Sequence, residues 1–175
     1  MLKNNLFISL VVLIIGLSSC TPLYQTVYKT PENQTQNYKY IVIQDFSKLE
    51  GEWVPYDSNT TIPDMIANKL LEQDNFKIVD RTENAITDEN ERVLLVRGTV
   101  TKFENGCKFC EWLHLGVNDS GLGSISIWVQ LVDKQSDTVI SEFSLRGRAK
   151  KPGHGKYRYI RVVDQTVIFI NEING

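Results

Sequence analysis

The hydrophobic segment at the start of the chain most strongly constrains what the remainder can fold into. Lys3 supplies a positive charge, residues 6–17 are almost continuously apolar, and the small pair Ser18-Ser19 leads into Cys20. This order is typical of a secretory signal peptide. The apolar run is also shorter than the ~20 residues that a membrane-spanning helix needs. We therefore expect residues 1–19 to be a signal peptide that lies outside the folded domain.

Leu17-Ser18-Ser19-Cys20 resembles the signal of bacterial lipoproteins. The resemblance implies that Cys20 becomes a diacylglyceryl thioether and the new N-terminus, with an acylated amine. Each buried methylene contributes about 0.8 kcal/mol, so three acyl chains such as palmitate would hold the protein permanently. Position 21 is Thr and not the aspartate that signals inner-membrane retention. We therefore expect the protein to lie at the periplasmic face of the outer membrane. An uncleaved anchor and an ordinary secreted protein are the alternatives.

Residues 20–38 are polar and rich in turn-forming residues, with Pro31 followed by six polar residues. Such a stretch buries too little apolar surface to offset the entropy lost on ordering. It is predicted to be a flexible, lipidated tether. Residues 39–175 have the length of a single domain.

The charge of the chain is nearly balanced, with 19 Lys and Arg against 21 Asp and Glu. This balance argues against a dedicated nucleic-acid-binding protein, because such domains are usually strongly basic. An extracytoplasmic location argues against it further.

The first part of the predicted domain has the order strand, helix, strand. Residues 38–46 are rich in strand-forming side chains, and residues 76–80 form a short second strand. Between them, Thr61 is expected to cap a helix with Pro63 in its first turn, and the helix should end near Asn75. This order predicts a βαβ unit with a right-handed crossover.

The second part of the domain contains three strand candidates, at residues 93–103, 124–132 and 138–148. Their apolar and polar residues alternate, which is typical of an antiparallel meander with one buried face. In the tail, Ile160, Val163, Val167 and Ile170 follow a helical period, and a terminal strand is the alternative. The predicted fold class is α+β, a single domain with the C-terminal helix packed on a mixed sheet.

Cys107 and Cys110 are the sharpest local signal in the predicted domain. In an oxidising compartment such a pair most often forms a local disulfide, and a redox-active pair is the alternative. His114 adds one further metal ligand, but structural zinc sites normally need four, so no metal is expected. Ser120 lies in a glycine-rich loop before a strand, where a flexible connection is a better interpretation than a catalytic serine or a phosphate-binding loop.

Basic residues are concentrated near the end of the chain, with Tyr157 and Tyr159 between them. They either form a solvated surface or bind lipid phosphates or an acidic partner. The members of this group are Arg146, Arg148, Lys150, Lys151, Lys156, Arg158 and Arg161.

The order of glycines and apolar residues between Tyr40 and Gly147 resembles a known family. It is that of bacterial lipoproteins with an uncharacterised domain related to the N-terminal domain of TolB and to the curli-secretion lipoprotein. The resemblance implies a compact α+β domain with helices against a mixed sheet, and it carries over no catalytic residues. The residues that carry it are Asp45-Phe46, Gly98, Val100, Phe103, Gly106, Gly116, Gly121, Gly123, Leu131-Val132-Asp133 and Val139.

Three functions remain open from the sequence. The leading one is a non-enzymatic, lipid-anchored module that binds an envelope protein or the cell wall, without a cofactor. The second is a ring-forming secretion or assembly component like the curli lipoprotein. The third is a thiol–disulfide or metal-dependent enzyme that uses Cys107, Cys110 and His114.

Overall fold

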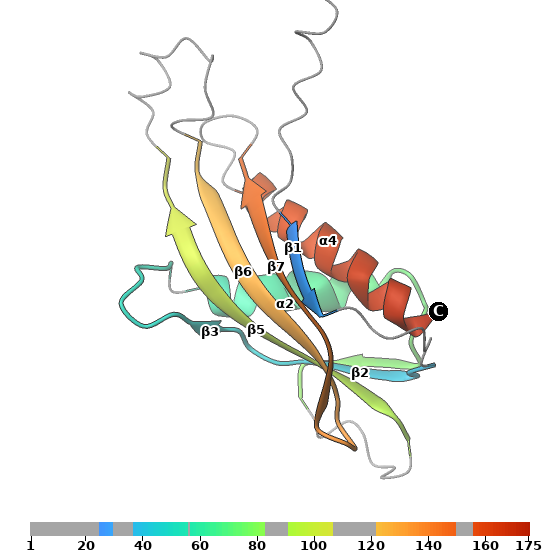
Figure 1. Cartoon of the computed structure of the whole chain (residues 1–175). Coiled ribbons are helices and arrows are strands. Elements are labelled where there is room, and N and C mark those ends of the chain that lie inside the picture. Colours follow the sequence, from blue (N-terminus) through green and yellow to red (C-terminus); the bar gives the residue numbers. More distant parts are fainter. Residues whose placement is uncertain (1–24, 30–36, 56, 83–90, 107–121, 150–155) are drawn as a thin grey trace, which may run out of the picture.

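The computed structural model describes residues 25–29, 37–55, 57–82, 91–106, 122–149 and 156–175 (Figure 1). They form a mixed seven-stranded sheet in the order β1-β7-β6-β5-β2-β4, with β3 paired to β5. Helices α2 and α4 pack against the sheet, and the main core lies between them and the sheet. The predicted α+β class, with a βαβ unit, a meander and a C-terminal helix, is confirmed.

The βαβ unit consists of β2 (Tyr40–Ile43), α2 (Ser58–Leu71) and β4 (Ile78–Asp80), and the two strands are parallel. The expected helix boundaries were wrong. The N-cap position of the helix is Asp57, four residues before Thr61, without a side-chain capping hydrogen bond, and the helix ends at Leu71 instead of Asn75. Consequently Pro63 lies inside the helix and not in its first turn.

Pro63 is tolerated there because another backbone group replaces its missing N–H. Within a helix that N–H would donate to the carbonyl of Asn59. Instead, the backbone N–H of Phe46 donates to the Asn59 oxygen at 2.9 Å. The ring of Phe46 also covers Gly98, where an added Cβ would lie 2.5 Å from it. The chain after β2 is thereby attached to both the helix and the sheet.

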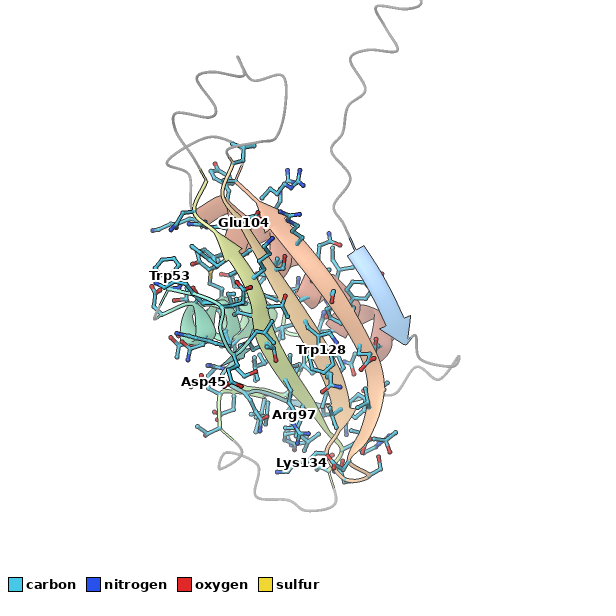
Figure 2. The ribbon with its side chains drawn as sticks, turned by 60° about the vertical axis from the view of Figure 1, so that its left-hand side comes forward. Asp45, Trp53, Arg97, Glu104, Trp128 and Lys134 are labelled. Atoms are coloured by element: carbon cyan, nitrogen blue, oxygen red, sulfur yellow. The ribbon has the colours of Figure 1, made fainter. Side chains whose placement is uncertain are left out.

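The meander consists of β5 (Val93–Glu104), β6 (Ser124–Asp133) and β7 (Thr138–Arg148), within a residue of the predicted ranges. The pairs β5–β6 and β6–β7 are antiparallel, while β5 runs parallel to β2. Side chains alternate as predicted: Val129 and Phe143 belong to the core beneath the helices. Trp128 and Ser144, their sequence neighbours, lie on the opposite, open face (Figure 2).

The tail forms the helix α4 (Lys156–Asn174), so the alternative of a terminal strand was wrong. Of the predicted stripe, Val163, Val167 and Ile170 are buried, whereas Ile160 is 37% exposed. The ring of Phe169 stacks on Phe143 of β7 with 4.3 Å between ring centroids. The helix approaches β7 most closely at Gly147, where an added Cβ would lie 2.1 Å from the carbonyl oxygen of Arg158. No helix in the described ranges has both the length and the apolar character needed to cross a membrane.

Part of the expected tether is folded, which corrects the prediction for residues 20–38. Strand β1 (Gln25–Lys29) pairs antiparallel with β7, with Gln25 opposite Leu145. Without it, the outer edge of β7 would present unpaired N–H and C=O groups, and an added strand satisfies them. Tyr38 is also buried in the main core. The short strand β3 (Ser47–Lys48) pairs parallel with β5.

Candidate functional site

Most of the predicted chemical residues fall outside the described part of the chain. In the described ranges, no group of three or more His, Cys, Asp or Glu residues is placed to hold a metal ion. The site that can be built is therefore the basic region around the end of β7 and the start of α4. The predicted residues that lie outside the described ranges are Cys20, Cys107, Cys110, His114, Ser120, Lys150 and Lys151.

The five described basic residues lie at one end of the molecule but on two layers. Arg146 and Arg148 alternate with the core residue Leu145 on β7, so they belong to the open face of the sheet. Lys156, Arg158 and Arg161 are in the first two turns of α4, on the helix layer. The close contact between Arg158 and Gly147 joins the two layers. The predicted patch is therefore divided by the sheet.

Arg146 belongs to a cluster of polar groups around the Glu104 carboxylate. The Arg146 guanidinium lies 2.6 Å from Glu104 Oε2, Ser124 Oγ donates to the same oxygen at 2.5 Å, and Lys102 Nζ lies 3.0 Å from Oε1. The hydrogen bonds from Ser124 and Lys102, followed by the Arg146 charge, lower the pKa of Glu104 to about 2. Glu104 therefore stays ionised and offsets the positive charge of Arg146.

Arg158 is a packing residue at the other side of the sheet. Its guanidinium lies 4.2 Å from the centroid of the Phe103 ring and donates to the backbone oxygen of Glu104 at 2.9 Å. The edge of Trp53 meets Phe103, with 5.5 Å between centroids. Gly123 lies beside the same guanidinium, and an added Cβ would lie 2.7 Å from Arg158 Nη1, so the guanidinium would have to shift. Through these contacts, Arg158 holds α4 against the end of β5.

Four neighbouring residues at the start of α4 have exposed or partly exposed side chains. Tyr157 and Ile160 are 38% and 37% exposed, Lys156 is exposed, and Arg161 is partly exposed. No carboxylate in the described ranges forms an ion pair with Lys156 or Arg161. We call Lys156, Tyr157, Ile160 and Arg161 the α4 surface cluster. It combines positive charge with apolar and aromatic surface.

At the opposite end of the strands, Asp133 is the centre of a cluster with Tyr38 and Arg92. Tyr38 donates its hydroxyl to Asp133 Oδ2 at 2.8 Å, and Arg92 Nη2 lies 2.7 Å from the same oxygen. The backbone N–H of Tyr38 donates to Asn174 Oδ1 at 2.6 Å. Burial raises the pKa of the Tyr38 hydroxyl. Burial also acts to raise the pKa of Asp133, but hydrogen bonds from Arg92 and Ser136 outweigh it and lower the pKa to about 2.

A third charged cluster centres on Arg81, just after β4. Its Nε donates to Asp64 of α2 at 2.8 Å, and its other nitrogens donate to Asp45 and to the backbone oxygen of Ile43. The carboxyl ends of parallel strands are common ligand sites. Here, however, the guanidinium and both carboxylates bind one another, and the cluster ties β2, α2 and β4 together.

Sequence reasoning missed both the Asp133 and the Arg81 clusters. Their members are 17 to 95 residues apart in sequence, so no local spacing reveals them. The one available signal is the position of Asp45, Arg81 and Asp133 at or just beyond strand ends, where polar side chains from different strands meet.

Comparison with known proteins finds similar structures but no similar sequences. The chain resembles PelC from Paraburkholderia phytofirmans, solved as a dodecamer, with a TM-score of 0.56 and 14% identity over 83% of this chain and 96% of that chain. A variant of the same PelC, also a dodecamer, gives the same TM-score and covers 98% of its chain. No family model and no curated protein matches by sequence.

Two further solved structures have lower similarity. A DUF330 protein from Xanthomonas campestris has a TM-score of 0.47 and 12% identity over 85% of this chain and 92% of its own. A lipoprotein from Neisseria meningitidis has a TM-score of 0.38 and 16% identity over 76% and 98%. At these identities the PelC likeness establishes the fold alone. The relation to TolB and to the curli lipoprotein stays a prediction.

Proposed function

We propose that this chain is a lipid-anchored accessory module of the bacterial envelope that acts by binding and not by catalysis. The Leu17-Ser18-Ser19-Cys20 signal carries the proposal, because it implies acylation of Cys20. The fold shared with PelC supports it, as does the composition of the α4 surface cluster, which suits contact with a surface better than it suits chemistry. The proposed location is the periplasmic face of the outer membrane.

The test is expression of the full precursor in a bacterial host, followed by mass spectrometry of the N-terminal peptide and separation of the two membranes on a sucrose gradient. We expect a triacylated N-terminal peptide that begins at Cys20. The protein should sediment with the outer membrane. Cys20→Ala should remain unprocessed, and Cys107→Ala is the matched control that keeps acylation. An unmodified Cys20, or a protein found in the cytosol with residues 1–19 intact, would refute the proposal.

The partner is sought by crosslinking in intact envelopes followed by mass spectrometry of the enriched protein. We expect a defined envelope protein or cell-wall fragment to be recovered with the wild type and not with Cys20→Ala, because the variant is held away from the outer membrane. Recovery of no partner in repeated experiments would count against a binding module.

A second candidate function is a ring-forming assembly component. The observation that favours it is the likeness to PelC, which was solved as a dodecamer. A closed ring needs two different surfaces that meet head to tail. The exposed side chains of Leu49 and Trp53, beside β3, supply an apolar surface at one edge of the sheet.

Multi-angle light scattering of the acylated protein in detergent tests this candidate. We expect a discrete mass of many subunits, which Trp53→Glu converts to a smaller species. Leu71→Glu is the control, because Leu71 is similarly exposed but lies on α2. A monomeric wild-type protein at micromolar concentration would eliminate the ring.

A further inference from the structure

The position of β1 determines which end of the domain lies nearest the lipidated cysteine. β1 runs antiparallel to β7, so its first residue, Gln25, lies opposite Leu145, three residues before the C-terminal end of β7. Five residue steps separate Gln25 from Cys20. At 3.3–3.6 Å per step, these residues span at most about 18 Å. Without β1, the 18 steps from Tyr38 would allow about 65 Å.

The same end of the sheet carries the start of α4. Gly147, two residues beyond the pairing partner of Gln25 on β7, packs against the backbone of Arg158. Figure 1 shows the start of α4 and the end of β7 at the same end of the molecule, with β1 beside β7. Because only five residue steps separate β1 from Cys20, β1 limits how far the α4 surface cluster can lie from the acylated residue.

The chemistry of this cluster suits a membrane interface. Lys156 and Arg161 supply positive charge, while Tyr157 and Ile160 expose aromatic and aliphatic surface. Basic residues attract anionic head groups only within about one Debye length, ~8–10 Å. Aromatic and apolar side chains beside them can enter the head-group region. A short connection to the lipid anchor allows the cluster to reach this distance from the membrane surface.

We infer that the α4 surface cluster binds anionic phospholipid head groups of the membrane that holds Cys20, and that β1 orients the domain for this contact. The inference rests on the proposed lipid anchoring. Arg146 and Arg158 contribute little, because Arg146 is paired with Glu104 and Arg158 is packed on Phe103. The bound form therefore has the start of α4 on the membrane and the Asp133 end away from it.

The test uses the acylated full-length protein in vesicles that contain dibrominated phosphatidylcholine, with or without 25% phosphatidylglycerol. Tryptophan is placed at the cluster by Tyr157→Trp or farther along the same helix by Ile168→Trp. Ile168 is 46% exposed and makes a matched control. Bromine quenches tryptophan only when the indole enters the lipid. We expect quenching beyond the wild-type background for Tyr157→Trp with phosphatidylglycerol, and none for Ile168→Trp.

Two further variants test the charge and the strand. Adding Lys156→Gln and Arg161→Gln to Tyr157→Trp should weaken binding to the vesicle surface about fivefold for each residue. Raising the salt concentration should also weaken the contribution of these two charges. Val27→Pro with Tyr28→Pro removes one N–H on each side of β1, one of which faces β7. It should reduce quenching too, whereas Val27→Ile with Tyr28→Phe should not.

Vesicle flotation separates the two levels of the argument. Protein that floats without quenching at position 157, or with equal quenching at positions 157 and 168, overturns this inference and leaves the lipid anchor intact. Protein that does not float refutes the anchor, and the inference with it. Quenching that is equal with and without phosphatidylglycerol overturns the role of anionic head groups.

Discussion

The β5–β6 pair carries an arginine–carboxylate interaction at each end, and the two differ in their surroundings. Asp133 closes β6 at one end, where its side chain is 6% exposed and binds Arg92 and Tyr38. Glu104 closes β5 at the other, where its side chain is 37% exposed and binds Arg146 and Ser124. Figure 2 shows Glu104 and Lys134, which follows Asp133, at opposite ends of the strands.

The comparison teaches that a similar pKa does not mean a similar role. Both carboxylates have a pKa lowered to about 2. Arg92 is 50% exposed, so the burial at the Asp133 end lies in Asp133 and in the Tyr38 hydroxyl that it accepts from. Removing Asp133 leaves that hydroxyl without an acceptor, whereas solvent can replace the more exposed Glu104 at little cost. We therefore expect the Asp133 end to stabilise the fold, while the Glu104 end adjusts the charge of the surface nearest the proposed anchor.

The largest expected effect comes from Asp133→Ala. It leaves the buried Tyr38 hydroxyl without its acceptor, and we expect a loss of about 3 kcal/mol in the free energy of unfolding. Glu104→Ala is the matched variant, with an expected loss under about 1 kcal/mol. Urea unfolding followed by circular dichroism measures both. Equal losses would break the distinction between the two ends.

The Glu104 end is expected to depend on packing more than on charge. Gly147→Ala places a methyl group 2.1 Å from the Arg158 carbonyl oxygen, so α4 must shift. We expect a loss of about 2 kcal/mol in unfolding free energy. Ser144→Ala, on the open face of β7, is the control and should change stability by less than about 0.5 kcal/mol. A neutral Gly147→Ala would show that α4 is not held here.

Lowering the pH should reveal the same difference in stability between the Asp133 end and the Glu104 end. Because folding lowers the pKa of Asp133 from its ordinary 3.8 to about 2, its contribution is present above pH 3.8 and is lost as the pH falls towards 2. The shift corresponds to about 2 kcal/mol. Urea unfolding at a series of pH values should show this loss in the wild type and a smaller one in Asp133→Asn. Glu104→Gln should change the profile less, because solvent screens its exposed pair.

The smallest effect concerns Cys107 and Cys110. We expect a local disulfide, which closes so short a loop that it contributes at most about 2 kcal/mol, less any strain. Alkylation of the non-reduced protein followed by mass spectrometry should leave both residues unlabelled. Reduction should then expose both to reagent and lower stability slightly. Two free, rapidly labelled thiols or a bound metal would instead support the enzymatic alternative.

Local pattern was sufficient for most elements of the fold. The alternation in residues 124–132 and 138–148 predicted β6 and β7 within a residue, and the stripe through Val163, Val167 and Ile170 predicted α4. These patterns work because each element buries one face along its own length. The start of α2 was wrong because Thr61 suits a cap locally, while the backbone of Phe46, from outside the helix, allows Pro63 to lie in its interior.

The candidate site was predicted only in part. Sequence reasoning singled out the basic residues near the end of the chain, but it treated them as one patch. The structure separates Arg146 from the α4 surface cluster by the thickness of the sheet and neutralises it with Glu104, 42 residues away. It also adds β1, whose five residues were predicted to belong to the tether and instead pair with the outer edge of β7.

The sequence by itself predicted a signal ahead of Cys20, and it determined the α+β class and the strands and helices that bury a continuous apolar face. Only the tertiary structure decided which charged residues pair, where Pro63 is tolerated and which end of the domain lies beside β1. The physical reason is how far apart the interacting residues lie in the sequence. A signal peptide and an amphipathic element are encoded by neighbouring residues, whereas an ion pair or an added edge strand exists only after distant segments have been brought together.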